Sequence, residues 1–385
     1  MPEPLRVAVV GYGWMGEVHA RAYARLRYHY PDIPLTPQLT VVSDVDRERC
    51  VAAVETFGFE RATTDWRDVI ADPGIEAVSV TAPNSLHRAM GVAVAAAGKH
   101  LWIEKPVGLG VDDARAVADA VRKAGVQSAV GFTYRTVPAV EAARAMIAAG
   151  DIGSVTHARV WLFTDYAAHP LGALNWRFQR ASGGSGVLGD LASHGADLVH
   201  FLLGPVERVV ADGAIFVPQR PMPTGLADHF AVASAGELRP VENDDFVSAL
   251  MQTASGARVM LEASRVSVGD QCNYGFEVRG TTGSVAWDFR QMGELAVCTG
   301  TDYLNQPTRT VFVGPGHGDY GRFQPGAGIA MSYDDLKVVE AARFVRSVAT
   351  GSPAGATLAD AVRTARLLDA VEQSTRTRAW VEVDR

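Results

Sequence analysis

The sequence contains little cysteine, no long apolar run and no excess of positive charge. Its three cysteines, Cys50, Cys272 and Cys298, are widely spaced, which predicts neither a disulfide framework nor a thiolate metal site. No stretch reaches the roughly 18 uncharged apolar residues of a membrane span, so we expect no membrane association. A net charge of -7 without a long basic run argues against nucleic-acid binding. The residues before Val7 lack the features of a signal peptide, so we expect a cytoplasmic protein.

The remaining composition is that of a globular α/β chain, and its 385 residues predict about two domains. Residues 1–131 alternate strands with Ala-rich helices, which predicts a doubly wound parallel sheet. We place its strands near Val7, Val41, Ala62, Ala77–Thr81, His100–Ile103 and Gln127–Gly131. In residues 132–385 strands follow one another with few helices, which predicts a mainly antiparallel sheet. These strands are expected at Thr156–Phe163, Val206–Val217, Phe246–Gln252, Arg258–Ala263 and Phe276–Val278, and the C-terminal segment is a candidate to pack back on the first domain.

A glycine motif follows the first strand directly. Gly11, Gly13 and Gly16 form G-x-G-x-x-G, with Trp14 and Met15 inside it, and a helix begins there. The glycines permit a tight turn, close approach to a pyrophosphate and close packing of helix and strand. Because the motif lies between a strand and a helix, it predicts dinucleotide binding.

A carboxylate ends the second strand. Asp44 lies 28 residues after Gly16, farther than the usual spacing of about 20, and we attribute the excess to a loop over residues 30–37. A carboxylate here accepts bonds from ribose hydroxyls and repels a 2'-phosphate, which favours NAD over NADP. Asp46 adds negative charge. The alternative is that Asp44 caps the helix expected over residues 47–57.

The tripeptide Glu104-Lys105-Pro106 closes the strand His100–Ile103. Pro106 has no N–H, so the strand stops there, and ligands bind at this end of an open α/β sheet. Lys105 is therefore the leading catalytic candidate. The alternative is a solvated Lys-Glu pair at a strand end.

A polar stripe interrupts an apolar helix in the second domain. Asp190, His194 and Asp197 have the i, i+4, i+7 spacing that puts side chains on one helical face. A carboxylate beside an imidazole orients the ring and raises its basicity, which suits removal of a hydroxyl proton. The alternatives are a structural network or a metal site. No third ligand is specified by the spacing, so we predict no metal.

Aromatic residues near these segments suit the CH faces of a sugar ring, namely Trp161, Phe163, Tyr166 and Trp176. Arg177 is a candidate donor to hydroxyls. Trp161 and Phe163 share one face of a strand, so core packing or subunit contact is the alternative for them. His317 lies in a turn-rich loop that is a candidate to reach the ligand crevice.

Together these motifs resemble the glucose-fructose oxidoreductase, inositol dehydrogenase and rhizopine-catabolism (Gfo/Idh/MocA) family. The resemblance spans essentially the whole chain and rests on residues 11–16, Pro83-Asn84 with His87, residues 97–100, Glu104-Lys105-Pro106 and residues 190–197. It implies an N-terminal Rossmann domain and a C-terminal α/β domain with a large open, mainly antiparallel sheet. It also implies a homodimer or homotetramer that uses this sheet.

The resemblance further implies roles for individual residues. Lys105, Asp190 and His194 match the catalytic lysine, aspartate and histidine. The expected NAD contacts are Gly11, Gly13, Trp14, Met15, Gly16, Asp44, Pro83, Asn84, His87, Glu104 and Lys105. The expected substrate contacts are Lys105, Tyr134, Arg135, Trp176, Arg177, Asp190, His194 and His317. Departures from the family pattern are Ser185 within the glycine triplet, Ala192 in place of glycine, and Thr133 where asparagine is common.

We therefore expect an NAD-dependent dehydrogenase that oxidises a secondary hydroxyl of a sugar, anhydrosugar or cyclitol. His194 would act as the base, Lys105 would stabilise the developing oxyanion, and Asp190 would orient His194 or bind a neighbouring hydroxyl. One alternative is NAD-dependent glycoside cleavage through transient ring oxidation. The other is a nucleotide-sensing regulator without chemistry, which would have little reason to keep these three residues together.

Overall fold

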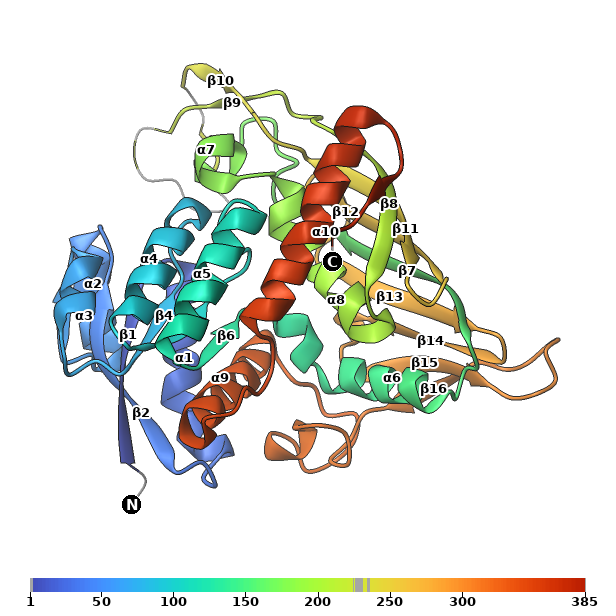
Figure 1. Ribbon diagram of the computed structural model, residues 1–385, viewed down its shortest axis with the longest axis horizontal. Coiled ribbons are helices and arrows are strands. Elements are labelled where there is room, and N and C mark those ends of the chain that lie inside the picture. Colours follow the sequence, from blue (N-terminus) through green and yellow to red (C-terminus); the bar gives the residue numbers. More distant parts are fainter. Residues whose placement is uncertain (1–2, 224, 226–230, 234–235, 385) are drawn as a thin grey trace. The chain divides into compact units, whose positions relative to one another are not determined.

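The computed structural model describes residues 3–223, 225, 231–233 and 236–384. The chain divides into two compact units, and each is formed from two separate stretches of sequence. The first unit comprises the residues up to Thr136 together with Met331–Val362, and the second comprises Val137–Ala330 with Arg363–Arg385. Helix α10 (Leu358–Thr377) continues from the last stretch of the first unit into the second (Figure 1). Within the described ranges, no helix has the length and hydropathy needed to cross a membrane.

The first unit contains the predicted parallel sheet. Its strands are β1 (Glu3–Val10), β2 (Leu35–Ser43), β3 (Arg61–Thr63), β4 (Ala77–Val80), β5 (His100–Ile103) and β6 (Ser128–Val130). Their order is β3-β2-β1-β4-β5-β6, and every neighbouring pair is parallel. The order reverses at β1, so a crevice for ligands is expected at the carboxyl ends of β1 and β4. All six strands confirm the sequence prediction.

The first unit also contains helices, and the ends of several follow from local sequence. They are α1 (Trp14–His29), α2 (Arg47–Phe57), α3 (Trp66–Ala71), α4 (Asn84–Ala96), α5 (Val111–Ala124), the 3-10 helix η1 (Thr133–Thr136) and α9 (Tyr333–Thr350). Helix α2 ends at Gly58 and α5 at Gly125, both with left-handed φ, which glycine adopts without strain. Helix α9 starts with a capping box between Ser332 and Asp335. Although it lies late in the sequence, α9 packs on α1 within the first unit.

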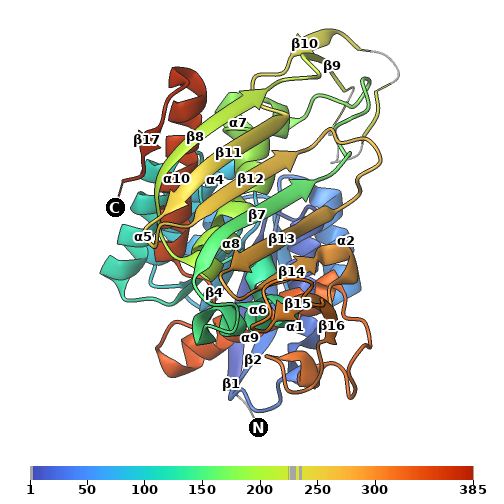
Figure 2. The ribbon, with the colours of Figure 1, turned by 90° about the vertical axis from the view of Figure 1, so that its right-hand side faces the viewer.

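The second unit contains a nine-stranded sheet in the order β16-β15-β14-β13-β7-β12-β11-β8-β17 (Figure 2). Its strands are β7 (Val155–Phe163), β8 (Val206–Ala214), β11 (Phe246–Thr253), β12 (Arg258–Ser264), β13 (Asn273–Gly280), β14 (Gly283–Asp288), β15 (Glu294–Thr299), β16 (Arg309–Phe312) and β17 (Val381–Glu382). Among the described strands of this sheet, only β7 and β12 pair in parallel. Strands β9 (Gln219–Pro221) and β10 (Leu238–Pro240) form a separate antiparallel pair. The mainly antiparallel sheet is confirmed.

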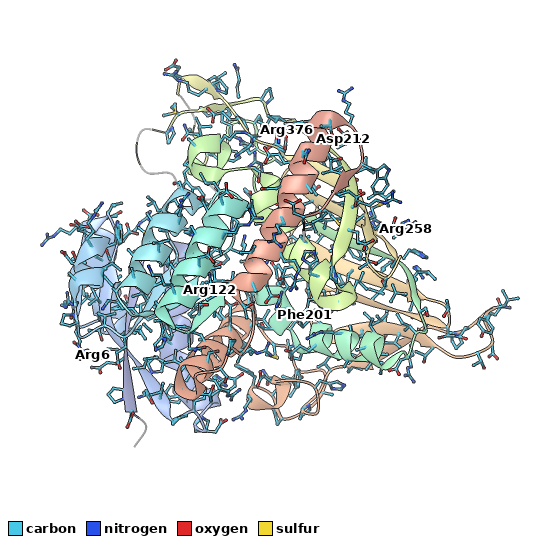
Figure 3. The ribbon with its side chains drawn as sticks, in the orientation of Figure 1. Arg6, Arg122, Phe201, Asp212, Arg258 and Arg376 are labelled. Carbon is cyan, nitrogen blue, oxygen red and sulfur yellow. The ribbon has the colours of Figure 1, made fainter. Side chains whose placement is uncertain are left out.

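Helices α6 (Pro138–Ala149) and α8 (Ser193–Leu203) of the second unit cover one face of this sheet. The short helix α7 (Arg180–Gly183) packs beside residues 176–178. Contact between α8 and the sheet is close, because a Cβ on Gly195 would lie 2.4 Å from a Leu261 methyl carbon. The Arg144 guanidinium of α6 lies 4.3 Å from the ring centroid of Phe201 on α8. Figure 3 labels Phe201 and, on β12, Arg258. Arg258 is exposed and lies on the opposite, open face.

Three sequence predictions differ from the observed strands by up to three residues, and one of them is the strand predicted at Phe276–Val278, which spans Asn273–Gly280. The loop predicted over residues 30–37 is too long, because β2 begins at Leu35 and pairs with β1 from Glu3 onward. Pro37 can lie in this part of β2, because proline is tolerated at a sheet edge. The beginning of β2 is such an edge, since β3 pairs only with Val41–Ser43. The strand predicted to reach Val217 ends at Ala214.

Candidate functional site

The turn between β1 and α1 has the geometry of a phosphate-binding loop. Gly11 has a φ of 87°, and a Cβ there would lie 2.6 Å from the Ala82 backbone nitrogen, so only glycine fits. A Cβ on Gly16 would lie 2.3 Å from the Gly11 carbonyl oxygen, whereas one on Gly13 would meet no atom within 4 Å. Gly13 precedes the first turn of α1, whose N–H groups favour an anion. The turn therefore fits the pyrophosphate of a dinucleotide.

Trp14 and Met15 are the first residues of α1. The Trp14 side chain is 62% exposed, and its ring stacks on Tyr333 with centroids 5.7 Å apart and an interplanar angle of 19°. Met15 is half-buried. Their contacts with a cofactor stay predictions.

Asp44 follows β2 directly, and two backbone N–H groups hold its carboxylate. Oδ2 accepts from the Tyr12 nitrogen at 2.5 Å and Oδ1 from the Asp46 nitrogen at 2.9 Å. The helix-capping alternative is wrong for Asp44, because Asp46 is the N-cap of α2 and accepts from the nitrogens of Glu48 and Arg49. A carboxylate has about four acceptor sites. Acceptor capacity therefore remains on Asp44 for ribose hydroxyls.

His87 connects two loops of the first unit. Helix α4 begins at Asn84, after Pro83, and the His87 side chain is buried. Its Nδ1 lies 2.7 Å from the Pro106 carbonyl oxygen, and its Nε2 lies 2.7 Å from the Ala82 carbonyl oxygen. Burial lowers the pKa of His87, and the two carbonyls partly offset this effect. The ring thus links the Pro83 loop to the loop of the predicted catalytic lysine, and its cofactor contact stays a prediction.

Lys105 follows β5 and is half-buried, and its peptide bond to Pro106 is cis. Glu104, in contrast, is buried within the first unit. Its carboxylate binds Lys337 Nζ at 2.5 Å and His19 Nε2 at 3.0 Å. The alternative of a solvated Lys-Glu pair is therefore wrong for Glu104. The cofactor contacts predicted for Glu104 and Lys105 stay predictions.

The segment after β6 is also packed inside the first unit. Arg135 is 6% exposed and forms an ion pair with Asp360 at 3.1 Å. Tyr134 is buried, and the Thr133 hydroxyl donates to Glu340 at 3.0 Å. The substrate contacts predicted for Tyr134 and Arg135 stay predictions, with the Arg135 charge already paired.

The polar helix of the second unit starts with a π-turn. The π-helix η3 (Leu188–Ala192) precedes α8, so this segment is not the continuous α-helix that we predicted. Because π-helical hydrogen bonds span five residues, the i, i+4 alignment of an α-helix does not apply between Asp190 and His194. Asp190 is partly exposed, whereas His194 and Asp197 are 8% and 2% exposed. Such π-turns occur frequently at functional sites.

Tyr166 positions the Asp190 carboxylate, a role that our sequence analysis missed. The Tyr166 hydroxyl donates to Asp190 Oδ2 at 2.6 Å. Its ring packs against a buried cluster formed by Ala167, Leu174, Phe178 and Val241. Burial, with the nearby Asp190 carboxylate, raises the pKa of Tyr166 far above its ordinary value. The phenol therefore remains a neutral donor to Asp190.

Other predicted substrate residues lie in short turns of the second unit. The Arg177 guanidinium carbon lies 4.3 Å from the ring centroid of Trp176 in the 3-10 helix η2 (Trp176–Phe178). His317 Nδ1 accepts from the Gly314 nitrogen at 3.1 Å, so the ring stabilises its own turn. Contacts of these residues with a substrate stay predictions.

Trp161 and Phe163 lie on the open face of the nine-stranded sheet. Leu162, between them, points to the other face, where a Cβ on Gly195 of α8 would lie 2.6 Å from its methyl carbon. The helix with Asp190 therefore covers the face opposite to Trp161 and Phe163. This arrangement does not support stacking of these two rings on a substrate, and it favours the alternative of an outer contact surface.

Lys337 and Glu340 are two further residues that were not predicted from the sequence. They lie three residues apart within the apolar segment Leu336–Ala342, at a spacing that puts both on one face of a helix. Both are buried. Two charges on one face of an otherwise apolar helical segment were a signal in the sequence that they required buried partners.

Comparison with known proteins identifies both units. Residues 5–132 match the family described as "Oxidoreductase family, NAD-binding Rossmann fold", and residues 140–286 match the "GFO/IDH/MocA C-terminal domain". The levoglucosan dehydrogenase of Pseudarthrobacter phenanthrenivorans is 35% identical over 98% of this chain and 98% of its own. The inositol 2-dehydrogenase of Rhizobium meliloti is 29% identical over 80% of this chain and 83% of its own.

A solved structure agrees with these relationships. Levoglucosan dehydrogenase in complex with NADH and levoglucosan superposes with a TM-score of 0.93 and 33% identity, covering 100% of both chains.

Proposed function

The chain belongs to the Gfo/Idh/MocA family of NAD-binding oxidoreductases, and we propose that it oxidises a secondary hydroxyl of a sugar or anhydrosugar, with a cyclitol as the next substrate class. The observation that carries this proposal is the Asp190 carboxylate, held by Tyr166 at 2.6 Å four residues before His194. The glycine turn and Asp44 supply a matching site for NAD. The relatives named above act on anhydrosugar and inositol hydroxyls, which supports this substrate class.

In the proposed mechanism His194, as the neutral imidazole, accepts the hydroxyl proton. Lys105 donates a hydrogen bond from its ammonium to the same oxygen and stabilises the charge that develops there. Asp190 orients His194 or accepts a bond from a neighbouring hydroxyl. The nicotinamide of bound NAD supplies the hydride acceptor.

We assign cofactor binding to the first unit, and substrate binding and assembly to the second. The open face of the nine-stranded sheet exposes Leu250 and Met260, which are cross-strand partners on β11 and β12. Apolar residues on an uncovered sheet face favour contact with a second copy. We therefore propose a homodimer or homotetramer that buries this face.

A substrate panel tests the proposed activity. Purified protein is incubated with NAD and monosaccharides, anhydrosugars, inositols or aryl glycosides, while NADH absorbance is followed. Sustained NADH formation with a sugar, anhydrosugar or cyclitol supports the proposal. Release of the aglycone without net NADH would instead favour glycoside cleavage, and NAD binding without any turnover would favour a regulator.

Asp44→Ala is expected to weaken NAD binding and to flatten the preference over NADP. Hydrogen bonds to a charged group contribute about 1.5–3 kcal/mol, so NAD affinity should fall roughly 10-fold or more. Calorimetric titration with both cofactors measures the effect. Asp119→Ala is a control with the same charge change, because Asp119 is exposed on α5 of the same unit. Unchanged selectivity in Asp44→Ala would show that this carboxylate does not recognise the ribose.

Tyr166→Phe is expected to lower kcat/KM about 10-fold, because it removes a hydrogen bond to the Asp190 carboxylate. The ring and its packing remain, so the melting temperature should change little. Tyr303→Phe is the matched control, since Tyr303 is 70% exposed in the same unit. A parental kcat/KM in Tyr166→Phe would mean that Asp190 does not depend on this hydroxyl.

A further inference from the structure

A buried network of charged side chains lies beneath the Lys105 loop, entirely within the first unit. Lys337 Nζ on α9 lies 2.5 Å from Glu104 Oε1 and 3.2 Å from Glu340 Oε1. His19 Nε2 on α1 lies 3.0 Å from Glu104 Oε1, and Trp102 Nε1 on β5 donates to Glu340 Oε1 at 2.7 Å. The His19 ring stacks on Trp102 with centroids 3.6 Å apart. Helix α9 is thus bonded to two residues at the carboxyl end of β5.

The network contains more negative than positive charge. Lys337 and His19 are fully buried, and Glu104 and Glu340 are 6% and 4% exposed. Burial alone would raise the pKa of Glu104, but Lys337 and His19 outweigh this and keep it well below its usual range. Burial raises the pKa of Glu340. Burial has the opposite effect on His19, whose pKa is lowered to about 4. With His19 neutral, Lys337 supplies the positive charge that Glu104 requires.

Stability alone does not account for such a network. Replacing a buried ion pair by apolar residues is often neutral or stabilising, because removing two charges from water costs several kcal/mol per ion. Breaking the pair on one side leaves an uncompensated charge. The directional bonds to Lys337 and His19 therefore fix the position of the Glu104 carboxylate more than they stabilise the fold.

The position of this carboxylate affects the next residue. Glu104 Oε2 accepts from the backbone nitrogen of Lys105 at 3.3 Å. On its other side the carboxylate packs against Gly131, where a Cβ would lie 2.4 Å from Oε2. A shift of Glu104 would therefore be transmitted to the Lys105 backbone.

We propose that Lys337 is a positioning residue for Lys105, acting through its ion pair with Glu104 and contacting neither substrate nor cofactor. This inference rests on the proposed role of Lys105 in oxidation. It assigns to α9, more than 200 residues later in the chain, a part in the geometry of the Glu104-Lys105-Pro106 loop.

Lys337→Met removes the charge and keeps most of the apolar stem. We expect kcat near pH 8 to fall about 10-fold or more, because a small displacement of a catalytic group carries a large cost in rate. NAD affinity, measured by titration, should stay within about twofold of the parent, since the glycine turn is untouched. Lys123→Met is the matched control, because Lys123 is exposed on α5 of the same unit.

Lys337→Met/Glu104→Gln tests the charge directly. The double variant has the same net buried charge as the parent, and the glutamine side chain that replaces Glu104 can still accept from His19. We expect its kcat to be closer to that of the parent than the kcat of Lys337→Met is. A purely structural role for the Lys337 side chain predicts the opposite, an equal or larger loss in the double variant.

The pH dependence gives a further readout. Glu104, directly after β5, and Lys337 on α9 act on the pKa of His19. The other titratable groups of the network are Glu340 and Tyr333 on α9 and Tyr23 on α1. Lys337 lowers the pKa of His19, so its removal raises that pKa and lets His19 carry the missing charge at low pH. The ratio of Lys337→Met kcat to parent kcat should therefore rise as pH falls and decline as pH rises. In the double variant this ratio should not change with pH.

Three results would overturn the inference. The first is a folded Lys337→Met with parental kcat, and the second is a loss of kcat that the double variant does not relieve and that does not change with pH. If circular dichroism shows that Lys337→Met does not fold, the single variant Glu104→Gln is used instead. A parental kcat in Glu104→Gln is then the third result that would overturn the inference. Lys105→Ala is measured in parallel. Parental kcat in Lys105→Ala would overturn the proposed catalytic role itself, whereas loss there with Lys337→Met unaffected would overturn only this inference.

Discussion

Replacing His194 by asparagine is expected to abolish most oxidation, with a loss in kcat of roughly 10²- to 10⁴-fold, as is typical for a general base. The parent rate should fall at acidic pH, because only the neutral imidazole accepts the hydroxyl proton. The variant should lack this dependence. Rates measured between pH 5 and 9 with the best panel substrate give both results.

His157→Asn is the control for this substitution, because His157 is exposed on β7 of the same unit. If His194→Asn retains the parent rate and pH profile, His194 is not the base. The structural-network interpretation of the polar helix would then be preferred, and the proton acceptor would have to be sought at Lys105 or His317.

Lys105→Ala should reduce turnover by about 100-fold or more, the loss expected when one donor to a developing oxyanion is removed. Because the side chain is half-buried at the end of β5, the fold should be retained. NAD affinity should also remain near that of the parent. Steady-state kinetics together with NAD titration separate the two effects, and Lys123→Ala controls for the loss of a lysine.

Other results would assign Lys105 differently. A loss confined to NAD affinity would make it a residue that positions the cofactor. Near-normal kcat with an active substrate would exclude its catalytic role.

Local patterns predicted the features whose physical cause is local. Gly11, Gly13 and Gly16 could be placed on a phosphate-binding turn because their spacing, between a strand and a helix, is a signal contained within six residues. The strands of the first unit were predictable because parallel, buried strands are short apolar runs between helices. Asp44 could be assigned to the end of β2, although Asp46 rather than Asp44 proved to be the helix cap.

Features that depend on distant partners were not predictable in the same way. Tyr166 was interpreted as an aromatic surface because nothing in its neighbourhood shows that its hydroxyl bonds Asp190. The ion pair between Glu104 and Lys337 was not predicted, because the two residues lie 233 positions apart in the sequence. The π-turn before α8 also escaped prediction, because its residues fit an α-helical pattern equally well.

The placement of α9 in the first unit affects how the chain folds during its synthesis. The strands of the parallel sheet are complete once Val130 has been synthesised, but Lys337 and Glu340 are added only some 200 residues later. Until then Glu104 lacks its bond to Lys337, and Trp102 lacks its bond to Glu340. Domains generally fold as units during synthesis, with the N-terminal one first. Here the nucleotide-binding half cannot reach its final packing on the ribosome before most of the second unit has emerged.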